Sequence, residues 1–289
     1  MSRYFTEAES VSTVLSRTSS AADPRLREVI ASLVEHLHAF AKEVSLTESE
    51  WDVAISFLTQ TGQISSGERQ EFILLSDVFG LSMLVDTINH RRPAAATEST
   101  VLGPFHVEGA PIREMGDNIC LDGKGESCTF TGRILDLDGL PISGAVVDVW
   151  SDNADGLYDV QQPGIQPKWN NRGRFVTNTD GQYEFVGIKP KPYSIPDDGP
   201  VGLLLDRLGR HPYRPAHLHY LITAPGHQRL VTHTFAESDE YLESDAVFGV
   251  RESLVANYEQ YEDGPTRWRC EFDFALAPNT DESRTRQTL

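Results

Sequence analysis

From about residue 120 onward, the chain consists of short stretches in which apolar and polar residues alternate, separated by Gly, Pro and Asp. Alternation with a period of two is the pattern of a β-strand that has one buried face. Many short strands at this spacing are typical of a β-sandwich or a β-barrel. The alternating segments are "TFTGRILDLDGLPISGAVVDVWSDN", "GRFVTNTDGQYEFVGIKP", "LHYLITAPGHQRLVTHTF" and "RCEFDFALAP". We therefore predict a mainly β fold, a sandwich or a barrel, in this part of the chain.

Two of these segments have turn residues at their centres. Asp180-Gly181 stands between two alternating runs, and this pair is favoured in two-residue hairpin turns. Pro225-Gly226 stands between "LHYLIT" and "RLVTHTF" in the same way. We expect the first of these segments to form a β-hairpin and the second to supply two further strands.

The first hundred residues follow a helical pattern instead. In "DPRLREVIASLVEHLHAFAKEV" the apolar residues recur at intervals of three and four. A second helix is indicated by the capping-box spacing of Thr47 and Glu50, with Gly62 as its expected end. A third apolar run is interrupted by Asp77, Gly80 and Asp86. These patterns predict several helices before the β-rich part.

The segment "NHRRPAAATEST" joins the two parts and has no clear period. We therefore predict an α-helical domain over residues 1–100 and a β-sandwich domain over residues 101–289. The formal net charge of −18 disfavours binding to nucleic acid and to anionic membrane surfaces. Three cysteines without a Cys-x-x-Cys pair fit a reducing compartment. With no apolar run of membrane-spanning length and no secretory signal, we expect a cytoplasmic protein without membrane insertion.

The densest group of titratable rings lies in "HPYRPAHLHYLITAPGH", at 211–227. In an extended strand His217 and His219 point to the same face, where both can reach one metal ion. The alternative is two polar residues on a solvated sheet face. Phenolate oxygens beside two imidazoles would favour a ferric ion. Tyr213 and Tyr220 are nearest in sequence, although Tyr220 points to the opposite face.

Three motifs in order, "ESTVLGPFHVEGAP", "VVDVWSDNADGLYD" and "YRPAHLHYLI", resemble the intradiol ring-cleavage dioxygenases, the catechol 1,2-dioxygenase group. The resemblance implies one non-haem Fe(III) per subunit, held by Tyr158, Tyr193, His217 and His219. It also implies a catalytic role for Arg214, which would stabilise negative charge on the substrate. Tyr193 would have a second role, as the ligand that leaves and accepts a substrate proton. The β-sandwich would then be the catalytic domain.

The segment "RLVTHTFAESDEYLESDAVFGV" is similar to the family members that cleave hydroxyquinol, benzene-1,2,4-triol, to maleylacetate. His233 stands where catechol-specific members tend to have Gln. Leu74 and Asp77 match pocket positions on one helix face, and Asp77 could accept a hydrogen bond from the third hydroxyl. Asp77 could equally face solvent or cap a neighbouring element. The expected substrate contacts are Leu74, Asp77, Val101, Leu102, Gly103, Pro104 and His233.

Other interpretations stay open at this point. The substrate could be catechol or a substituted or chlorinated catechol, which would give cis,cis-muconates. Outside the family, the His pair could belong to a non-catalytic β-sandwich that binds a metal or a sugar, or to a structural protein. The resemblance implies that the N-terminal helices form a homodimer with bound phospholipid. Packing within one chain would explain their apolar stripes equally well.

Overall fold

The computed structural model describes residues 4–18, 20, 22–67 and 69–279. The remaining positions lie outside the described residues. Some of them belong to the predicted domain at 1–100 and the others to the predicted domain at 101–289. The chain divides into two compact units, Met1–Gln63 and Ile64–Leu289, and each is described by itself. Among the described residues, no helix is long and apolar enough to cross a membrane.

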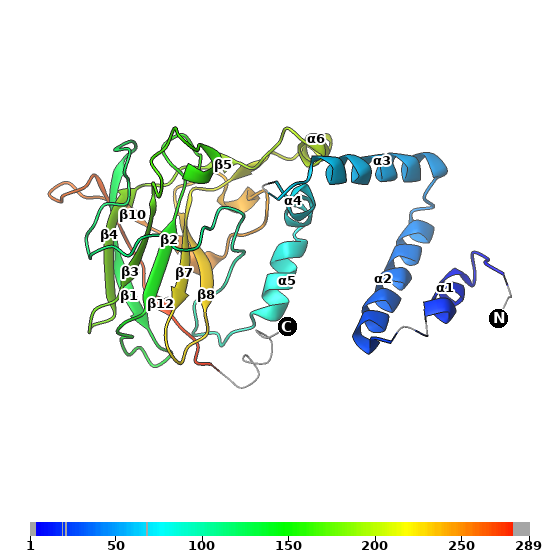
Figure 1. Ribbon diagram of the computed structural model, residues 1–289, viewed down its shortest axis with the longest axis horizontal. Coiled ribbons are helices and arrows are strands. Elements are labelled where there is room, and N and C mark those ends of the chain that lie inside the picture. The colour runs from blue at the N-terminus through cyan, green and yellow to red at the C-terminus, as the bar shows by residue number, and fades with distance from the viewer. Residues whose placement is uncertain (1–3, 19, 21, 68, 280–289) are drawn as a thin grey trace. The chain divides into compact units, whose positions relative to one another are not determined.

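The first unit is helical, as the apolar spacing predicts (Figure 1). Asp23 caps the second helix by accepting hydrogen bonds from the backbone N–H groups of Arg25 and Leu26. The predicted capping box is confirmed, because the Thr47 N–H donates to Glu50 and the Glu50 N–H donates to Thr47 Oγ1. The helices are α1 (Ser10–Thr18), α2 (Pro24–Glu43) and α3 (Glu48–Ile64).

The second predicted helix, which begins after Thr47, was expected to end at Gly62. This expected end is wrong, because α3 continues through Gly62 to Ile64. A glycine inside a helix costs only about 1 kcal/mol relative to alanine, and the surrounding turns tolerate it.

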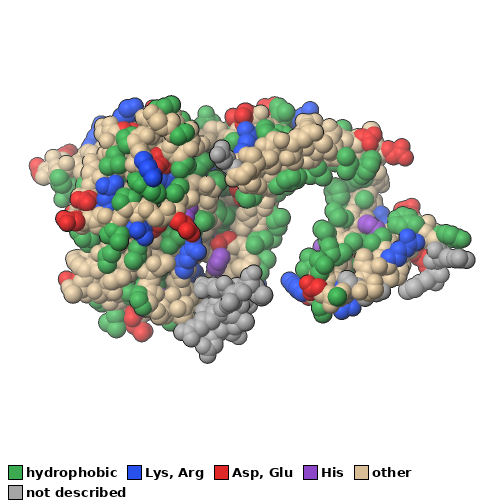
Figure 2. Space-filling view, viewed as in Figure 1, with side chains coloured by type: hydrophobic (Ala, Val, Ile, Leu, Met, Phe, Trp, Pro, Cys, Tyr) green, Lys and Arg blue, Asp and Glu red, His purple; other side chains and the backbone are tan. Residues whose placement is uncertain are grey.

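The apolar residues of α2 and α3 lie on the surface, where Figure 2 shows hydrophobic side chains along both helices. No residue of α2 is buried. These stripes are therefore not buried by packing among the described helices of the first unit. The exposed apolar residues of the two helices include Leu26, Val29, Leu33, Leu37, Phe40, Trp51, Val53, Ile55 and Leu58.

The second unit contains the predicted β-sandwich (Figure 1). One sheet consists of β1 (Ser127–Leu135), β4 (Gln182–Ile188), β10 (Tyr258–Gln260), β11 (Trp268–Glu271) and β12 (Phe274–Ala275). The other consists of β2 (Val146–Trp150), β3 (Arg172–Val176), β7 (His217–Thr223), β8 (Leu230–Ala236) and β9 (Val255–Ala256). A separate two-stranded ribbon pairs β5 (Tyr193–Ser194) with β6 (Tyr213–Arg214).

The core lies between the two sheets. Phe130 and Phe185 come from the first sheet, and Val149, Leu218 and Tyr220 come from the second. All five are at most 1% exposed, so the inward faces form one apolar layer. Because side chains alternate along β7, its histidines lie on the other face of the second sheet.

The two strands predicted around Pro225-Gly226 are confirmed, whereas the hairpin predicted around Asp180-Gly181 is wrong. β7 and β8 pair antiparallel around Pro225-Gly226, as expected. The strands on either side of Asp180-Gly181 belong to different sheets, since β3 pairs with β2 and β4 pairs with β1. The turn is tight, with Gly181 at a φ of 70°, but the strands diverge after it to cover both sides of the core.

Three helices of the second unit adjoin the sandwich: α4 (Glu71–Val78), α5 (Leu81–Asn89) and α6 (Pro200–Arg207). The predicted interruption at Gly80 is confirmed, since this residue separates α4 from α5 at a φ of 71°. Asp77 and Asp86 lie within the helices. Arg210 donates to the carbonyl of Val78, which ties the end of α4 to the β-rich part. Short 3₁₀ helices are Asp159–Gln161, Leu242–Ser244 and Glu252–Leu254.

Candidate metal centre and active site

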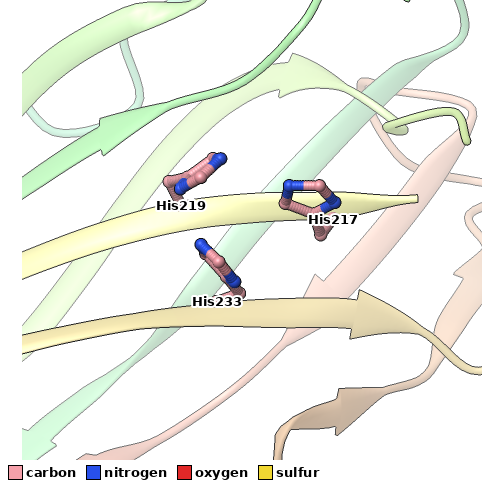
Figure 3. Close-up of side chains that lie close together, drawn as sticks. All are labelled: His217, His219 and His233. Atoms are coloured by element: carbon pink, nitrogen blue, oxygen red, sulfur yellow. The ribbon is translucent and has the colours of Figure 1, made fainter. Parts of the chain in front are cut away.

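Three buried histidines meet on the face of the second sheet that is turned away from the core (Figure 3). His217 and His219 lie two residues apart on β7, so alternation places them on one face. His233 lies directly opposite His219 in the β7–β8 register. One ring nitrogen of each lies within 4.8 Å of those of the other two. Each side chain is at most 1% exposed, so the cluster is screened from water.

Hydrogen bonds fix the orientation of His217. Its Nδ1 lies 2.7 Å from the carbonyl oxygen of Pro215, which can only accept, so Nδ1 carries the proton. Its Nε2 therefore has a free lone pair, to which Arg214 Nη1 donates at 3.2 Å. Burial and the nearby Arg214 lower the pKa of His217 to about 3. The ring is neutral near pH 7, which is the form that binds a metal.

His219 is held by aromatic neighbours. Its ring stacks on Trp150, with ring centres 4.7 Å apart and an angle of 17° between the planes. Its Nε2 lies 3.0 Å from the hydroxyl of Tyr158. Burial, followed by the charges of His233 and His217, lowers the pKa of His219 well below its ordinary value. This imidazole is also neutral.

Two tyrosines adjoin the histidines from outside the second sheet. Tyr158 precedes a 3₁₀ helix, and Tyr193 is in the β5–β6 ribbon, paired with Arg214. Their rings meet edge to face with centres 5.8 Å apart, and the Tyr193 ring centre lies 5.4 Å from that of His217. Burial raises the pKa of both phenols. Both are therefore protonated unless a cation stands beside them.

Arg214 is a buried charge with one strong partner. Its Nε and Nη2 donate to the two carboxylate oxygens of Asp245, at 3.1 and 3.3 Å. Asp245 also accepts from the backbone N–H groups of Val247 and Gly249. Burial disfavours the Arg214 charge, but Asp245 and Tyr193 outweigh it and raise its pKa. The guanidinium therefore stays charged beside His217 and Tyr193.

The residues fit a metal cation with nitrogen and phenolate ligands. Two neutral imidazoles and two phenols converge, and the Tyr158 hydroxyl lies 3.0 Å from His219 Nε2, so oxygen and nitrogen donors stand side by side. Imidazole nitrogens and phenolate oxygens together suit a ferric ion. A ferric ion would also lower the pKa of the phenols enough to deprotonate them, as it does for bound thiols and water.

The predicted substrate contacts are distributed around this cluster. The loop at 101–104 lies against it, since a Cβ at Gly103 would come within 3.2 Å of His219 Cε1. His233 is fully buried, with its Nδ1 3.0 Å from Thr100 Oγ1, and belongs to the histidine cluster itself. Val101 and Leu102 are half-buried and Pro104 is exposed.

Leu74 and Asp77 lie on α4 and are half-buried. Burial raises the pKa of Asp77, whereas a hydrogen bond from Ser82 and the charge of Arg214 oppose this shift. Asp77 is therefore within electrostatic range of Arg214.

Sequence reasoning missed two residues of the site. Asp245, the partner of Arg214, stands 31 residues further along the chain, and no local pattern connects the two. Trp150 could have been found, because strand alternation in "VVDVW" puts its side chain on the face opposite to Val147 and Val149.

The chain is similar to known proteins over nearly its whole length. Residues 101–278 match the family described as "Dioxygenase", and residues 23–97 match "Catechol dioxygenase N terminus". A hydroxyquinol 1,2-dioxygenase from Rhizobium sp. is 56% identical over 284 residues, which is 95% of this chain and 96% of the relative. A 6-chlorohydroxyquinol 1,2-dioxygenase from Cupriavidus pinatubonensis is 51% identical, covering 92% of this chain and 95% of the relative.

Solved structures give the same result. A hydroxyquinol 1,2-dioxygenase from Pseudomonas putida superposes with a TM-score of 0.91 at 46% identity, covering 94% of this chain and 99% of that chain. A catechol 1,2-dioxygenase from Acinetobacter sp. superposes with a TM-score of 0.80 at 28% identity, covering 94% of this chain and 92% of that chain.

Proposed function

Because the chain belongs to the intradiol ring-cleavage dioxygenase family, we propose that it cleaves hydroxyquinol with O2 to maleylacetate, using Fe(III). The chain is an intradiol ring-cleavage dioxygenase. The proposal concerns its metal, its substrate and its product. It is carried by one observation, the buried convergence of neutral imidazoles and phenols beside the charged Arg214. Relatives named as hydroxyquinol and 6-chlorohydroxyquinol 1,2-dioxygenases support the choice of substrate.

We assign Tyr158, Tyr193, His217 and His219 as the residues that hold the iron. The Pro215 carbonyl keeps the proton of His217 on Nδ1 and leaves Nε2 for the metal. Stacking on Trp150 fixes the ring of His219. When bound, Fe(III) would supply the charge that keeps a vicinal diol deprotonated and its ring reactive toward O2.

The remaining chemistry is assigned to side chains of this chain. Tyr193 is the phenolate that accepts a proton from the incoming diol, because Arg214 beside it stabilises the anionic form. Arg214 then stabilises the negative charge that develops on the substrate during cleavage. Asp245 keeps the guanidinium in place by accepting hydrogen bonds from its Nε and Nη2. The burial of the cluster excludes water, so water screens the interactions between these charges only weakly.

We propose that substrate selection lies with α4 and the loop at 101–104. Asp77 would accept a hydrogen bond from the third hydroxyl of hydroxyquinol, and Leu74, Val101, Leu102, Gly103 and Pro104 would contact the ring. We also propose His233, whose ring lies next to that of His219, as a substrate contact. Asp77 is half-buried, and leaving its carboxylate without a hydroxyl partner costs free energy, so catechol should bind less well.

The exposed stripes on α2 and α3 support a homodimer formed through the N-terminal helices, with phospholipid as a proposed occupant of the apolar interface. We also propose that the enzyme acts in the cytoplasm. All three cysteines are free and buried, as in proteins of reducing compartments.

The metal assignment is tested by visible absorption and iron content of the purified protein. Two phenolates on Fe(III) should give a red protein with about one iron per subunit. Tyr158→Phe and Tyr193→Phe should each bleach or shift the band. Tyr220→Phe is the matched control, because Tyr220 is on the same strand as the histidines but faces the core. A colourless protein that is replete with metal would contradict the assignment.

A further inference from the structure

One row of side chains crosses the outer face of the second sheet and ends at a buried arginine. On one side of His219 in the strand register lies His233, and on the other side lies Trp150. The next residue in the row is Arg172 on β3, which lies opposite Trp150. Directly opposed residues of antiparallel strands share a face, so Arg172 is on the same face as the histidine cluster. Its side chain is 1% exposed, and an arginine is seldom so deeply buried without a partner for its charge.

The guanidinium of Arg172 connects two segments that adjoin the metal centre. Its Nε donates to Asp159 Oδ1 at 2.6 Å, and Asp159 directly follows Tyr158 in the chain. Its Nη1 donates to the carbonyl oxygen of Phe105 at 2.7 Å, directly after the loop at 101–104. Both hydrogen bonds are short and come from one planar charged group, so they fix the two segments relative to β3.

Both segments determine where the ring of Tyr158 lies. The ring of Phe105 stacks on it, with ring centres 4.4 Å apart and an angle of 23° between the planes. The guanidinium carbon of Arg172 lies 6.0 Å from the centre of the same ring, within reach of a cation–π contact. Because the Tyr158 hydroxyl lies 3.0 Å from His219 Nε2, the orientation of this ring decides where the phenol oxygen meets the imidazole.

Asp159 and Arg172 form a buried ion pair beside the tyrosine. Asp159 is 7% exposed, and its Oδ2 accepts a hydrogen bond from the backbone N–H of Trp169 at 3.1 Å. The two charges balance each other, and removal of either one would leave the other uncompensated in a buried place. An uncompensated charge there would act on the phenol oxygen of Tyr158 through little water.

We propose that Arg172 is a positioning residue for Tyr158, which anchors both segments around the ring and stabilises its phenolate form by charge. This inference rests on the proposed iron centre, in which Tyr158 is a ligand. Each proposed phenolate then has a buried arginine–aspartate pair beside it, because Arg214 stands next to Tyr193 in the same way. Arg214 acts on the tyrosine that accepts a proton, and Arg172 acts on the other one.

Visible absorption of the iron-loaded protein tests the role of the charge. Arg172→Gln leaves the negative Asp159, so the phenolate releases its electrons more easily and the band should move to longer wavelength. Asp159→Asn leaves the positive Arg172, so the band should move to shorter wavelength. A pair with a merely structural role would not move the band in opposite directions. Arg174→Gln is the control, because Arg174 is on the same face of β3 but its Nε donates to the carbonyl of Ala110.

Hydrogen exchange of the purified full-length protein, followed by mass spectrometry, tests the anchoring and does not depend on which metal is bound. In Arg172→Gln the amides at 101–106 and 157–162 should exchange about tenfold faster or more, because the hydrogen bonds that hold both segments are lost. The control Arg174→Gln should leave the exchange of these amides unchanged. If Arg172→Gln does not fold, Arg172→Lys replaces it here, since lysine lacks the planar fork that reaches both acceptors. Asp159→Asn alone then decides the direction of the band.

Shifts of the band in the same direction in both charge variants, or no shift in either, overturn the inference. Unchanged exchange at 101–106 and 157–162 overturns it as well. A wild-type protein without the tyrosinate band contradicts the proposed iron centre instead, and the exchange rates then decide whether Arg172 anchors the segment of Tyr158.

Discussion

At the scale of single residues, Asp245 determines where the Arg214 guanidinium lies. It accepts from two nitrogens of that group and is itself held by two backbone N–H groups. In Asp245→Asn, Arg214 loses its negatively charged partner. The amide nitrogen of the new asparagine would also face one of the Arg214 N–H donors and could not accept a hydrogen bond from it. We expect kcat per bound iron to fall about tenfold or more, with a smaller change in KM.

Steady-state kinetics of hydroxyquinol cleavage, normalised to the iron content, measures this effect. Asp206→Asn on α6 is the control, because that side chain is exposed. An Asp245→Asn enzyme with full kcat per iron would show that Arg214 needs no carboxylate partner.

Asp77 is the second residue with a specific expected role. It is half-buried on α4 within electrostatic range of Arg214. Asp77→Asn should reduce the preference for hydroxyquinol over catechol, measured as a ratio of kcat/KM values, by about tenfold, because a hydrogen bond to a charged acceptor is lost. Asp52→Asn, in the exposed part of α3, should leave the ratio unchanged. An unaltered ratio in Asp77→Asn would remove this residue from substrate selection.

The residues of the candidate site differ in how far the sequence could reveal them. His217 and His219 could be placed on one face because strand alternation is a local rule. Tyr158 and Tyr193 lie where no periodic pattern applies, so only the family motifs indicated them. Asp245 was not found, because its contact with Arg214 depends on how two distant segments pack.

At the scale of elements, the break between α4 and α5 depends on Gly80. Its φ of 71° lies in the left-handed region, and a Cβ there would lie 3.3 Å from the ring of Phe248. Gly80→Ala should therefore lower the free energy of unfolding by about 1 kcal/mol or more. Gly209→Ala is a matched control, since Gly209 has a similar φ of 66° but nothing within 4 Å.

Urea unfolding of both variants separates the two contributions. The control should show only the cost of the backbone conformation, and Gly80→Ala should show that cost and the contact with Phe248. Equal losses in the two variants would mean that the Phe248 ring moves aside without cost.

Helices and strands could be predicted where a local sequence pattern determines them. Which strands pair with each other could not, because strand pairing depends on the packing of the whole domain. Helix α2 and the hairpin of β7 and β8 follow directly from apolar spacing and turn residues. The segment around Asp180-Gly181 has the same local signal, but its strands enter two different sheets. The packing of both sheets against one core decides which sheet each strand joins. The local sequence of a turn and its two flanking strands does not contain that information.

At the scale of the whole molecule, the mainly β fold could be predicted from the strand pattern, whereas the homodimer is a proposal that rests on the exposed stripes of α2 and α3. Leu33→Glu on α2 places a charge in the apolar stripe of each copy. If α2 forms the proposed homodimer interface, the dimer dissociation constant should rise about 100-fold or more. Sedimentation velocity across a range of concentrations measures it, with Glu35→Gln as the control on a polar position of the same helix. An unchanged dissociation constant would place the interface elsewhere.

We propose that the chain cleaves hydroxyquinol in preference to catechol. The most direct measurement is O2 uptake by the purified, iron-loaded wild-type enzyme with each substrate side by side, with the dicarboxylic acid products identified by mass spectrometry. We expect a higher kcat/KM for hydroxyquinol and maleylacetate as its product. Faster turnover of catechol, with cis,cis-muconate as the main product, would contradict it.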